Sequence, residues 1–183
     1  MKLSQLRNVR AIAERGTLRG AARALGLDSI SFLASDVTSQ AFNRELVWPG
    51  ERQNEIALSS SEVAALEAEI DLLIGEHACD IQSKYVVESE EKLRRISRHF
   101  RAHLDQISAE APRCNAPWVS AVVEVDGTVR PCFFHPKIGS LKTATLEEVL
   151  NSGEAQAFRS TLDIASNPIC QRCVCSLNYK EAG

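Results

Sequence analysis

Apolar residues recur at helical spacing in the longer, N-terminal part of the chain, and this pattern predicts three helical stretches. Within each stretch, residues three or four positions apart place their apolar side chains on one face of a helix. Gly26 is the expected stop of the first stretch, and Ser89 is the expected N-cap of the third. The predicted stretches cover residues 3–25, 60–78 and 90–107.

Two short apolar runs, residues 29–35 and 84–87, predict buried strands between these helices. A helix that stops at a glycine and is followed by a buried strand is typical of an α/β unit with a parallel sheet. The intervening segment 36–58 is predicted to be irregular, because Asp, Asn, Pro and Gly interrupt it. The charge run Glu88–Glu91 is interpreted as the solvated start of the third helix.

The pattern changes at Pro112, which places a predicted domain boundary near residue 110. Beyond it, two strand-like runs flank Asp126-Gly127, a dipeptide typical of a tight hairpin turn with positive φ. The C-terminal part is therefore predicted to be a small α+β domain with one β-hairpin. The expected strands cover residues 118–125 and 128–132, and two short helices are expected over residues 146–151 and 154–162.

Composition excludes several classes of protein. The 183 residues carry a formal net charge of −3, so no broad basic surface for nucleic acid is expected. No run of about 18 apolar residues predicts a transmembrane helix, and the N-terminus lacks the apolar core of a secretory signal. We therefore expect a cytoplasmic protein without membrane or nucleic-acid partners. Phosphate-binding loops, dinucleotide fingerprints and nucleophile–base pairs are not recognisable, so no catalytic residue is assigned.

Five of the six cysteines gather in the C-terminal part, and Cys79 stands apart. In the cytoplasm, grouped cysteines are more often metal ligands or redox groups than structural disulfides. A hairpin brings its two ends together, so the two cysteines that flank the hairpin are expected to lie close to each other. The C-x2-C pair in the tail adds two more, which gives four thiolates. Four thiolates suit either a tetrahedral zinc or a [4Fe–4S] cluster. The candidates are Cys114 and Cys132 beside the hairpin and Cys170, Cys173 and Cys175 in the tail.

The spacing of these cysteines resembles that of a known domain family. Cys114 is followed, after twelve residues, by Gly127-x4-Cys132, which is similar to the C-x9–15-G-x4-C opening of the SPASM domain. SPASM domains and the shorter twitch domains are C-terminal extensions of radical S-adenosylmethionine (radical SAM) enzymes and hold auxiliary [4Fe–4S] clusters. Further similarities to the SPASM domain are the turn at 138–141, the helix at 146–149, and Phe158-Arg159 before the closing C-x2-C pair. A weaker match relates residues 24–32 to a late helix–strand unit of a radical SAM partial barrel.

The resemblance implies a fold, a division into domains and a ligand set. The expected fold class is α/β: residues 1–110 as the last units of a partial TIM-like barrel, then residues 111–183 as a small SPASM/twitch-like domain. By resemblance, the auxiliary cluster is held by Cys114, Cys132, Cys170 and Cys173, with Cys175 as the alternative ligand. In the intact family, the barrel cluster reduces S-adenosylmethionine to a 5′-deoxyadenosyl radical, and the auxiliary cluster binds substrate or carries an electron.

The sequence departs from the family pattern in two places. The radical SAM signature C-x3-C-x2-C is absent, so we expect a chain that does not cleave S-adenosylmethionine alone. It is then a fragment, a remnant of a longer gene, or one half of an enzyme whose radical SAM half is a separate polypeptide. The tail reads Cys170-x2-Cys173-x-Cys175 instead of C-x2-C-x5-C-x3-C, which favours a single cluster, as in a twitch domain. Related domains act on peptides, protein side chains and small metabolites, and a zinc-binding interaction module with four cysteine ligands and no catalysis is the alternative function.

Other residues near the cysteines each have two interpretations. His135, three residues after a cysteine, is interpreted first as an ordinary loop histidine, and a ligand or a hydrogen-bond donor to a ligand is the alternative. Arg130 and Arg172 either offset thiolate charge or are solvated. Trp118 and Phe133-Phe134 are expected in the core or in a dry wall around the cluster.

Overall fold

The described chain forms two compact units, which we treat separately. The structure, a computed structural model, describes residues 18–39, 41 and 47–179. The first unit combines the described parts of Met1–Leu33 with Ser60–Arg98, and the second combines those of Ala34–Ser59 with His99–Gly183. The domain boundary predicted near residue 110 stays a prediction. None of the helices among the described residues has the length and apolar character needed to cross a bilayer.

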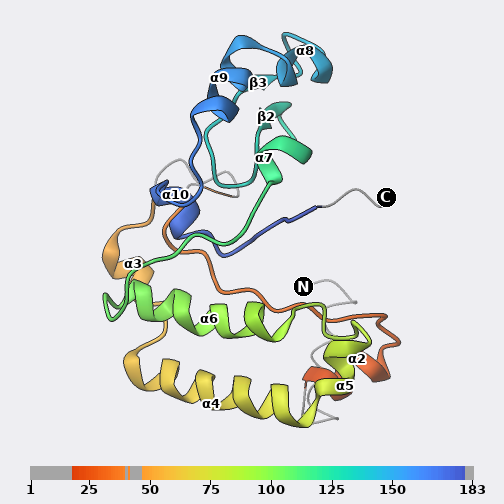
Figure 1. Cartoon of the computed structure of the whole chain (residues 1–183), viewed down its shortest axis with the longest axis vertical. Coiled ribbons are helices and arrows are strands. Elements are labelled where there is room, and N and C mark those ends of the chain that lie inside the picture. The colour runs from red at the N-terminus through yellow and green to blue at the C-terminus, as the bar shows by residue number, and fades with distance from the viewer. Residues whose placement is uncertain (1–17, 40, 42–46, 180–183) are drawn as a thin grey trace. The chain divides into compact units, whose positions relative to one another are not determined.

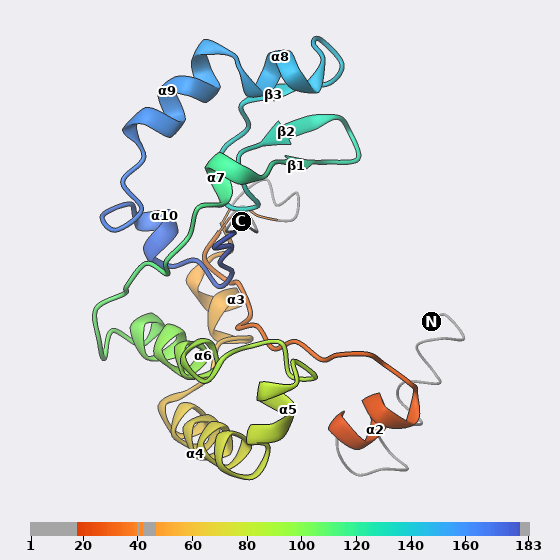
Figure 2. The same ribbon diagram turned by 45° about the vertical axis from the view of Figure 1, so that its right-hand side comes forward.

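Helices dominate the first unit. Its longest helices, α4 and α6, lie side by side, as both ribbon views show (Figures 1 and 2). Their facing apolar residues pack around a buried centre of Ile70, Val86 and Leu93, in agreement with the helical periodicity of the sequence. The elements are α2 (Leu18–Ala24), α4 (Ser60–Glu76), α5 (Ala78–Gln82) and the start of α6 (Glu90–His103).

The expected helix boundaries at Gly26 and Ser89 are confirmed. Gly26 has φ +67°, and the N–H groups of Gly26 and Leu27 donate back to the carbonyl oxygens of Arg23 and Ala22. The Ser89 hydroxyl accepts the N–H of Lys92 at 3.3 Å, as an N-cap does. Most of the first predicted helix, residues 3–17, lies outside the described residues.

The two predicted buried strands of the first unit are reduced to one contact. Ile30 and Val86 form an isolated parallel bridge, and no longer parallel ladder occurs among the described residues. Beyond the bridge, the N–H of Phe32 donates to the Glu88 carboxylate at 2.9 Å, where a strand would donate to a neighbouring carbonyl. The side chain of Glu88 thus ends the pairing, and the partial barrel stays a prediction.

The charge run Glu88–Glu91 was predicted to be solvated, and this prediction is wrong for Glu88. Its residue surface is only 6% exposed, and its carboxylate accepts from the Ser31 hydroxyl at 2.6 Å as well as from the Phe32 N–H. A buried carboxylate is stable in the fold when hydrogen bonds replace its water. Glu90 and Glu91 do remain on the exposed first turn of α6, where they pair with Arg94 and Arg98.

The second unit contains a three-stranded antiparallel sheet in the order β1–β2–β3. The strands are β1 (Val122–Val123), β2 (Thr128–Arg130) and β3 (Gly139–Ser140). Val123 pairs with Val129 in the first ladder, and Val129 pairs with Gly139 in the second. The predicted hairpin turn is confirmed, because Gly127 has φ +86° and the Asp126 carboxylate accepts the N–H of Thr128.

Short helices surround this sheet, and β3 and α8 pack against each other. The small core consists of Val129, Ile138, Val149 and Ala155. The expected helices 146–151 and 154–162 are present as α8 (Leu146–Leu150) and α9 (Gly153–Thr161), capped by the hydroxyls of Thr145 and Ser152. The remaining helices are α3 (Gly50–Asn54), α7 (Ala116–Val119) and α10 (Pro168–Gln171).

Two local predictions in this unit differ from the structure. The strand expected from residue 118 begins only at Val122, because Ala116-Pro117 start the short helix α7, and Pro fits the first turn of a helix. The third strand, Gly139–Ser140, was not predicted, because two residues carry no periodic pattern. The close approach of Gly139 to Val149 fixes it in place, since a Cβ built on Gly139 would lie 2.6 Å from Val149 Cγ1.

Replacement of the buried carboxylate in Glu88→Ala is expected to weaken the first unit by roughly 1–3 kcal/mol, because the partly buried N–H of Phe32 loses its acceptor. Hydrogen–deuterium exchange at the Phe32 amide measures the effect locally. Glu91→Ala is the matched control, since its side chain is 76% exposed and its ion pair with Arg98 contributes little. Equal exchange rates in the two variants would contradict the assigned role of Glu88.

Gly139→Ala is expected to lower the free energy of unfolding of the second unit by about 1–3 kcal/mol, because the added methyl group overlaps Val149. Both tryptophans belong to this unit, so urea unfolding followed by tryptophan fluorescence reports on it. Gly153→Ala is the control, since a Cβ there meets no atom within 4 Å. Adding Val149→Ala should restore part of the loss, and a Gly139→Ala variant as stable as the control would refute the overlap.

Candidate metal centre

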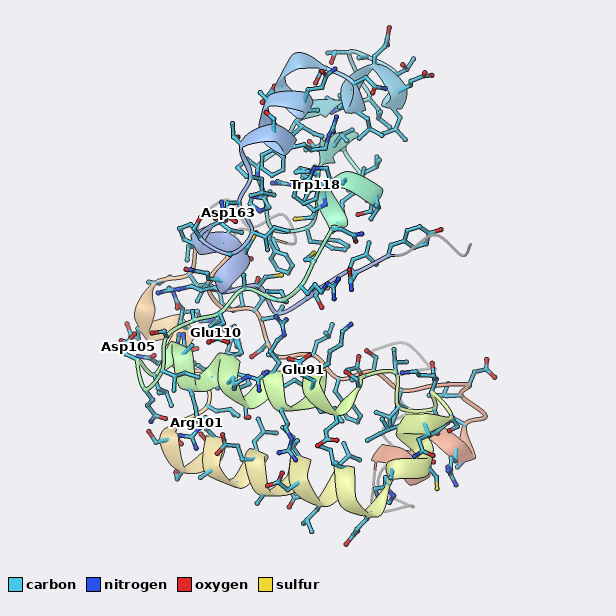
Figure 3. All side chains as sticks on the ribbon, in the orientation of Figure 1. Glu91, Arg101, Asp105, Glu110, Trp118 and Asp163 are labelled. Carbon is cyan, nitrogen blue, oxygen red and sulfur yellow. The ribbon has the colours of Figure 1, made fainter. Side chains whose placement is uncertain are left out.

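Five cysteines of the second unit lie at the base of the hairpin and in the tail. Cys114 precedes α7, Cys132 follows β2, Cys170 lies in α10, and Cys173 and Cys175 follow that helix. All six cysteines of the chain are described and none forms a disulfide. The five are partly buried, whereas Cys79, in α5 of the first unit, is exposed. Figure 3 shows sulfur atoms, in yellow, near α7 and α10.

Hydrogen bonds of Asn115 join the tail to the segment that carries Cys114. The backbone N–H of Asn115 donates to the carbonyl oxygen of Leu177 at 2.7 Å. Its side-chain amide donates to the carbonyl oxygen of Tyr179 at 2.7 Å and accepts the Tyr179 N–H at 2.9 Å. Segments more than sixty positions apart in the sequence are thereby held together on either side of the cysteines.

Thiols from the hairpin base and from the tail are electrostatic neighbours. Burial raises the pKa of Cys132, and the neighbouring thiols of Cys114 and Cys175 raise it further. Burial likewise raises the pKa of Cys170 to about 11, with added contributions from Cys132, Cys114 and Asp163. The thiol of Cys173 donates to the carbonyl oxygen of Cys175 at 2.6 Å. The structure therefore brings sulfurs from both segments into one neighbourhood.

The chemistry of this neighbourhood fits a cationic centre. Without a cation, closely spaced buried thiolates repel each other and lack water, so protonated thiols are favoured. A bound metal reverses this preference, because it is coordinated by thiolates and releases their protons. The thiols as placed are not yet arranged around one ion, since the described residues contain no group of three or more His, Cys, Asp or Glu side chains that could hold one.

Backbone N–H groups already point at two of the sulfurs. Those of Phe134 and His135 donate to the Cys132 sulfur and oppose the rise in its pKa. The N–H of Ala116 donates to the Cys114 sulfur at 3.5 Å. Such N–H donors stabilise thiolate charge, and they are among the features that set the potential of iron–sulfur clusters. The peptide backbone around the sulfurs is thus suited to thiolate ligands.

His135 lies inside this neighbourhood. Its residue surface is 3% exposed, and its Nε2 atom lies 3.3 Å from the sulfur of Cys170. Burial lowers the pKa of His135, which favours the neutral imidazole. The favoured interpretation of an ordinary loop histidine is therefore corrected, because the structure buries His135 beside the sulfur of a candidate ligand.

Of the other residues with two interpretations, Arg172 agrees with the solvated alternative, whereas Arg130, Trp118 and Phe133 differ from what was expected. Arg130 pairs with Glu124 at 2.5 Å and donates to the carbonyl oxygen of His135, so it supports the loop instead of facing a thiolate. Arg172 is exposed. Trp118, labelled in Figure 3, and Phe133 are 45% and 47% exposed, so neither is a core residue.

Sequence reasoning missed two residues of the site. Asn115 is one of the twelve unspecified residues between Cys114 and Gly127, and its contacts reach across a distance in sequence that no periodic pattern reveals. Asp163, also labelled in Figure 3, accepts from the Ala165 N–H and the Ser166 hydroxyl, and these bonds lower its pKa. Its charge acts on Cys170. The Asp-x-Ala-Ser stretch before the tail cysteines was the available signal for this turn.

In the metal-free, reduced protein, Cys132 and Cys170 are expected to react with iodoacetamide several-fold more slowly than exposed Cys79 at about pH 8. A raised pKa leaves less thiolate at this pH, and the difference should shrink as the pH rises toward the pKa of about 11 of Cys170. Mass spectrometry of the labelled peptides measures each rate. In urea the three rates should converge, and equal rates in the folded chain would refute the burial of these thiols.

Comparison with known protein families gives one match. Residues 114–174 match the family SPASM, described as an iron–sulfur cluster-binding domain. The matched segment begins at Cys114 and contains Cys132, Cys170 and Cys173, and Cys175 lies just beyond it. Comparisons with curated proteins and with solved structures find no match. Residues 114–174 are therefore similar to a SPASM domain, and this similarity implies iron–sulfur cluster binding by this part of the chain.

Proposed function

We propose that the second unit binds a single auxiliary [4Fe–4S] cluster of a radical SAM enzyme. The proposed ligands are Cys114 and Cys132 from the hairpin base and Cys170 and Cys173 from the tail, with Cys175 as the alternative to Cys173. The observation that carries the proposal is the meeting of these two segments. Asn115 bonds to Leu177 and Tyr179, and His135, three residues after Cys132, lies 3.3 Å from the sulfur of Cys170. The similarity to an iron–sulfur domain supports a cluster over zinc.

The tail offers two candidates for the fourth ligand. Cys175 is close enough to Cys132 to raise its pKa. Cys173 belongs to the C-x2-C pair with Cys170, and its thiol is bound to the carbonyl oxygen of Cys175. Both cysteines are therefore candidates for the one remaining ligand position.

The polypeptide supplies the environment of the cluster. When bound, a [4Fe–4S] cluster supplies one-electron transfer or an iron site for substrate. The chain provides the thiolates, donates backbone N–H groups to Cys132 and Cys114, and partly shields Cys132 from water. The sequence has no C-x3-C-x2-C motif, so we propose that S-adenosylmethionine is cleaved by a radical SAM half that lies outside residues 1–183.

Anaerobic reconstitution with iron and sulfide is expected to give a brown protein with about four iron and four sulfide ions per chain. Cys114→Ser should lose most of this iron, because a hydroxyl is a poor substitute for a thiolate ligand. Cys79→Ser is the matched control and should keep it, since Cys79 is an exposed residue of the other unit. Visible absorption, electron paramagnetic resonance and metal analysis give the readout.

The same preparations of Cys173→Ser and Cys175→Ser identify the fourth ligand. We expect Cys173→Ser to lose more iron than Cys175→Ser, and the reverse order would assign the position to Cys175. A colourless wild-type protein with one zinc and no sulfide would contradict the cluster and establish a zinc site with four cysteine ligands.

A further inference from the structure

His135 contacts sulfurs from both segments of the candidate site. Its backbone N–H donates to the sulfur of Cys132, which follows the hairpin. Its ring Nε2 lies 3.3 Å from the sulfur of Cys170, which lies in α10. One residue therefore connects two proposed ligands that are 38 positions apart in the sequence.

The imidazole ring is held firmly in this place. Its edge packs against the ring of Phe158 in α9, with a centroid distance of 4.9 Å and an interplanar angle of 66°. The carbonyl oxygen of His135 accepts from Arg130 Nη1 at 3.1 Å, and Arg130 is itself paired with Glu124. A ring fixed by packing and by its own backbone keeps a hydrogen bond aimed in one direction.

The polarity of the contact follows from the partner. A thiolate bound to iron has no proton and only accepts hydrogen bonds, so the contact requires a proton on Nε2. A neutral imidazole with its N–H at Nε2 meets this requirement without adding a buried charge. The nearly complete burial of His135 excludes water as the competing partner.

We infer that His135 is a positioning residue for the cluster: its Nε2–H donates to the sulfur of Cys170 while its backbone N–H donates to Cys132. This inference rests on the proposed cluster and deepens it. Hydrogen bonds donated to ligand sulfurs stabilise the reduced, more negative state of an iron–sulfur cluster. His135 therefore raises the reduction potential, in addition to aligning a hairpin ligand with a tail ligand.

His135→Phe and His135→Gln separate the hydrogen bond from the packing. Phenylalanine keeps an aromatic ring against Phe158 but has no donor, whereas glutamine keeps an N–H at nearly the same reach. After anaerobic reconstitution, His135→Phe is expected to have a more negative reduction potential than the wild type, and His135→Gln a potential close to the wild type. Redox titration followed by electron paramagnetic resonance measures the three potentials.

Each outcome decides the inference. Potentials that are equal in all three proteins, or shifted alike in both variants, would refute the hydrogen bond. If only His135→Phe fails to take up iron and His135→Gln takes it up normally, the result supports positioning of the cluster by the hydrogen-bond donor. If both variants fail, His135 serves packing, and the inference is overturned. A wild-type protein that takes up no cluster would contradict the proposed function itself. Variants with the same potential as the loaded wild type would contradict only the role of His135.

Discussion

The closure of the tail onto the base of the hairpin is the constraint on which the candidate site depends. It is made by Asn115, which bonds with its backbone to Leu177 and with its side-chain amide to both backbone groups of Tyr179. The amide of Asn115 acts like a residue of a neighbouring strand, so the tail is paired without forming a sheet. This closure holds the tail beside the segment that carries Cys114.

Burial and closure together give the site a definite chemical character. The thiols of Cys132 and Cys170 are held where ionisation is unfavourable, yet N–H donors of Phe134, His135 and Ala116 are already directed at neighbouring sulfurs. This combination favours protons when no metal is present and favours a cationic centre when one is offered.

The sequence predicted the parts of the fold that depend on local signals. The turn at Asp126-Gly127, the stop at Gly26 and the cap at Ser89 were all predicted, because each needs only its neighbours. The strand at 29–35 was wrong in extent, since a distant carboxylate, Glu88, takes the backbone donor that pairing would use. In the site, cysteine spacing identified candidates, but Asn115 acts across 64 positions and could not be inferred from spacing.

The contact of Asn115 with Tyr179 also sets the register of the chain end. Cys175 lies four residues before Tyr179, so the length of this short connection determines how far the tail sulfurs can travel once the end is docked. Inserting or deleting one residue there would move the sulfurs by about 3.3 Å along an extended chain, which is more than a metal–sulfur bond length of about 2.3 Å. The number of residues in this connection is therefore constrained by the contact at Tyr179.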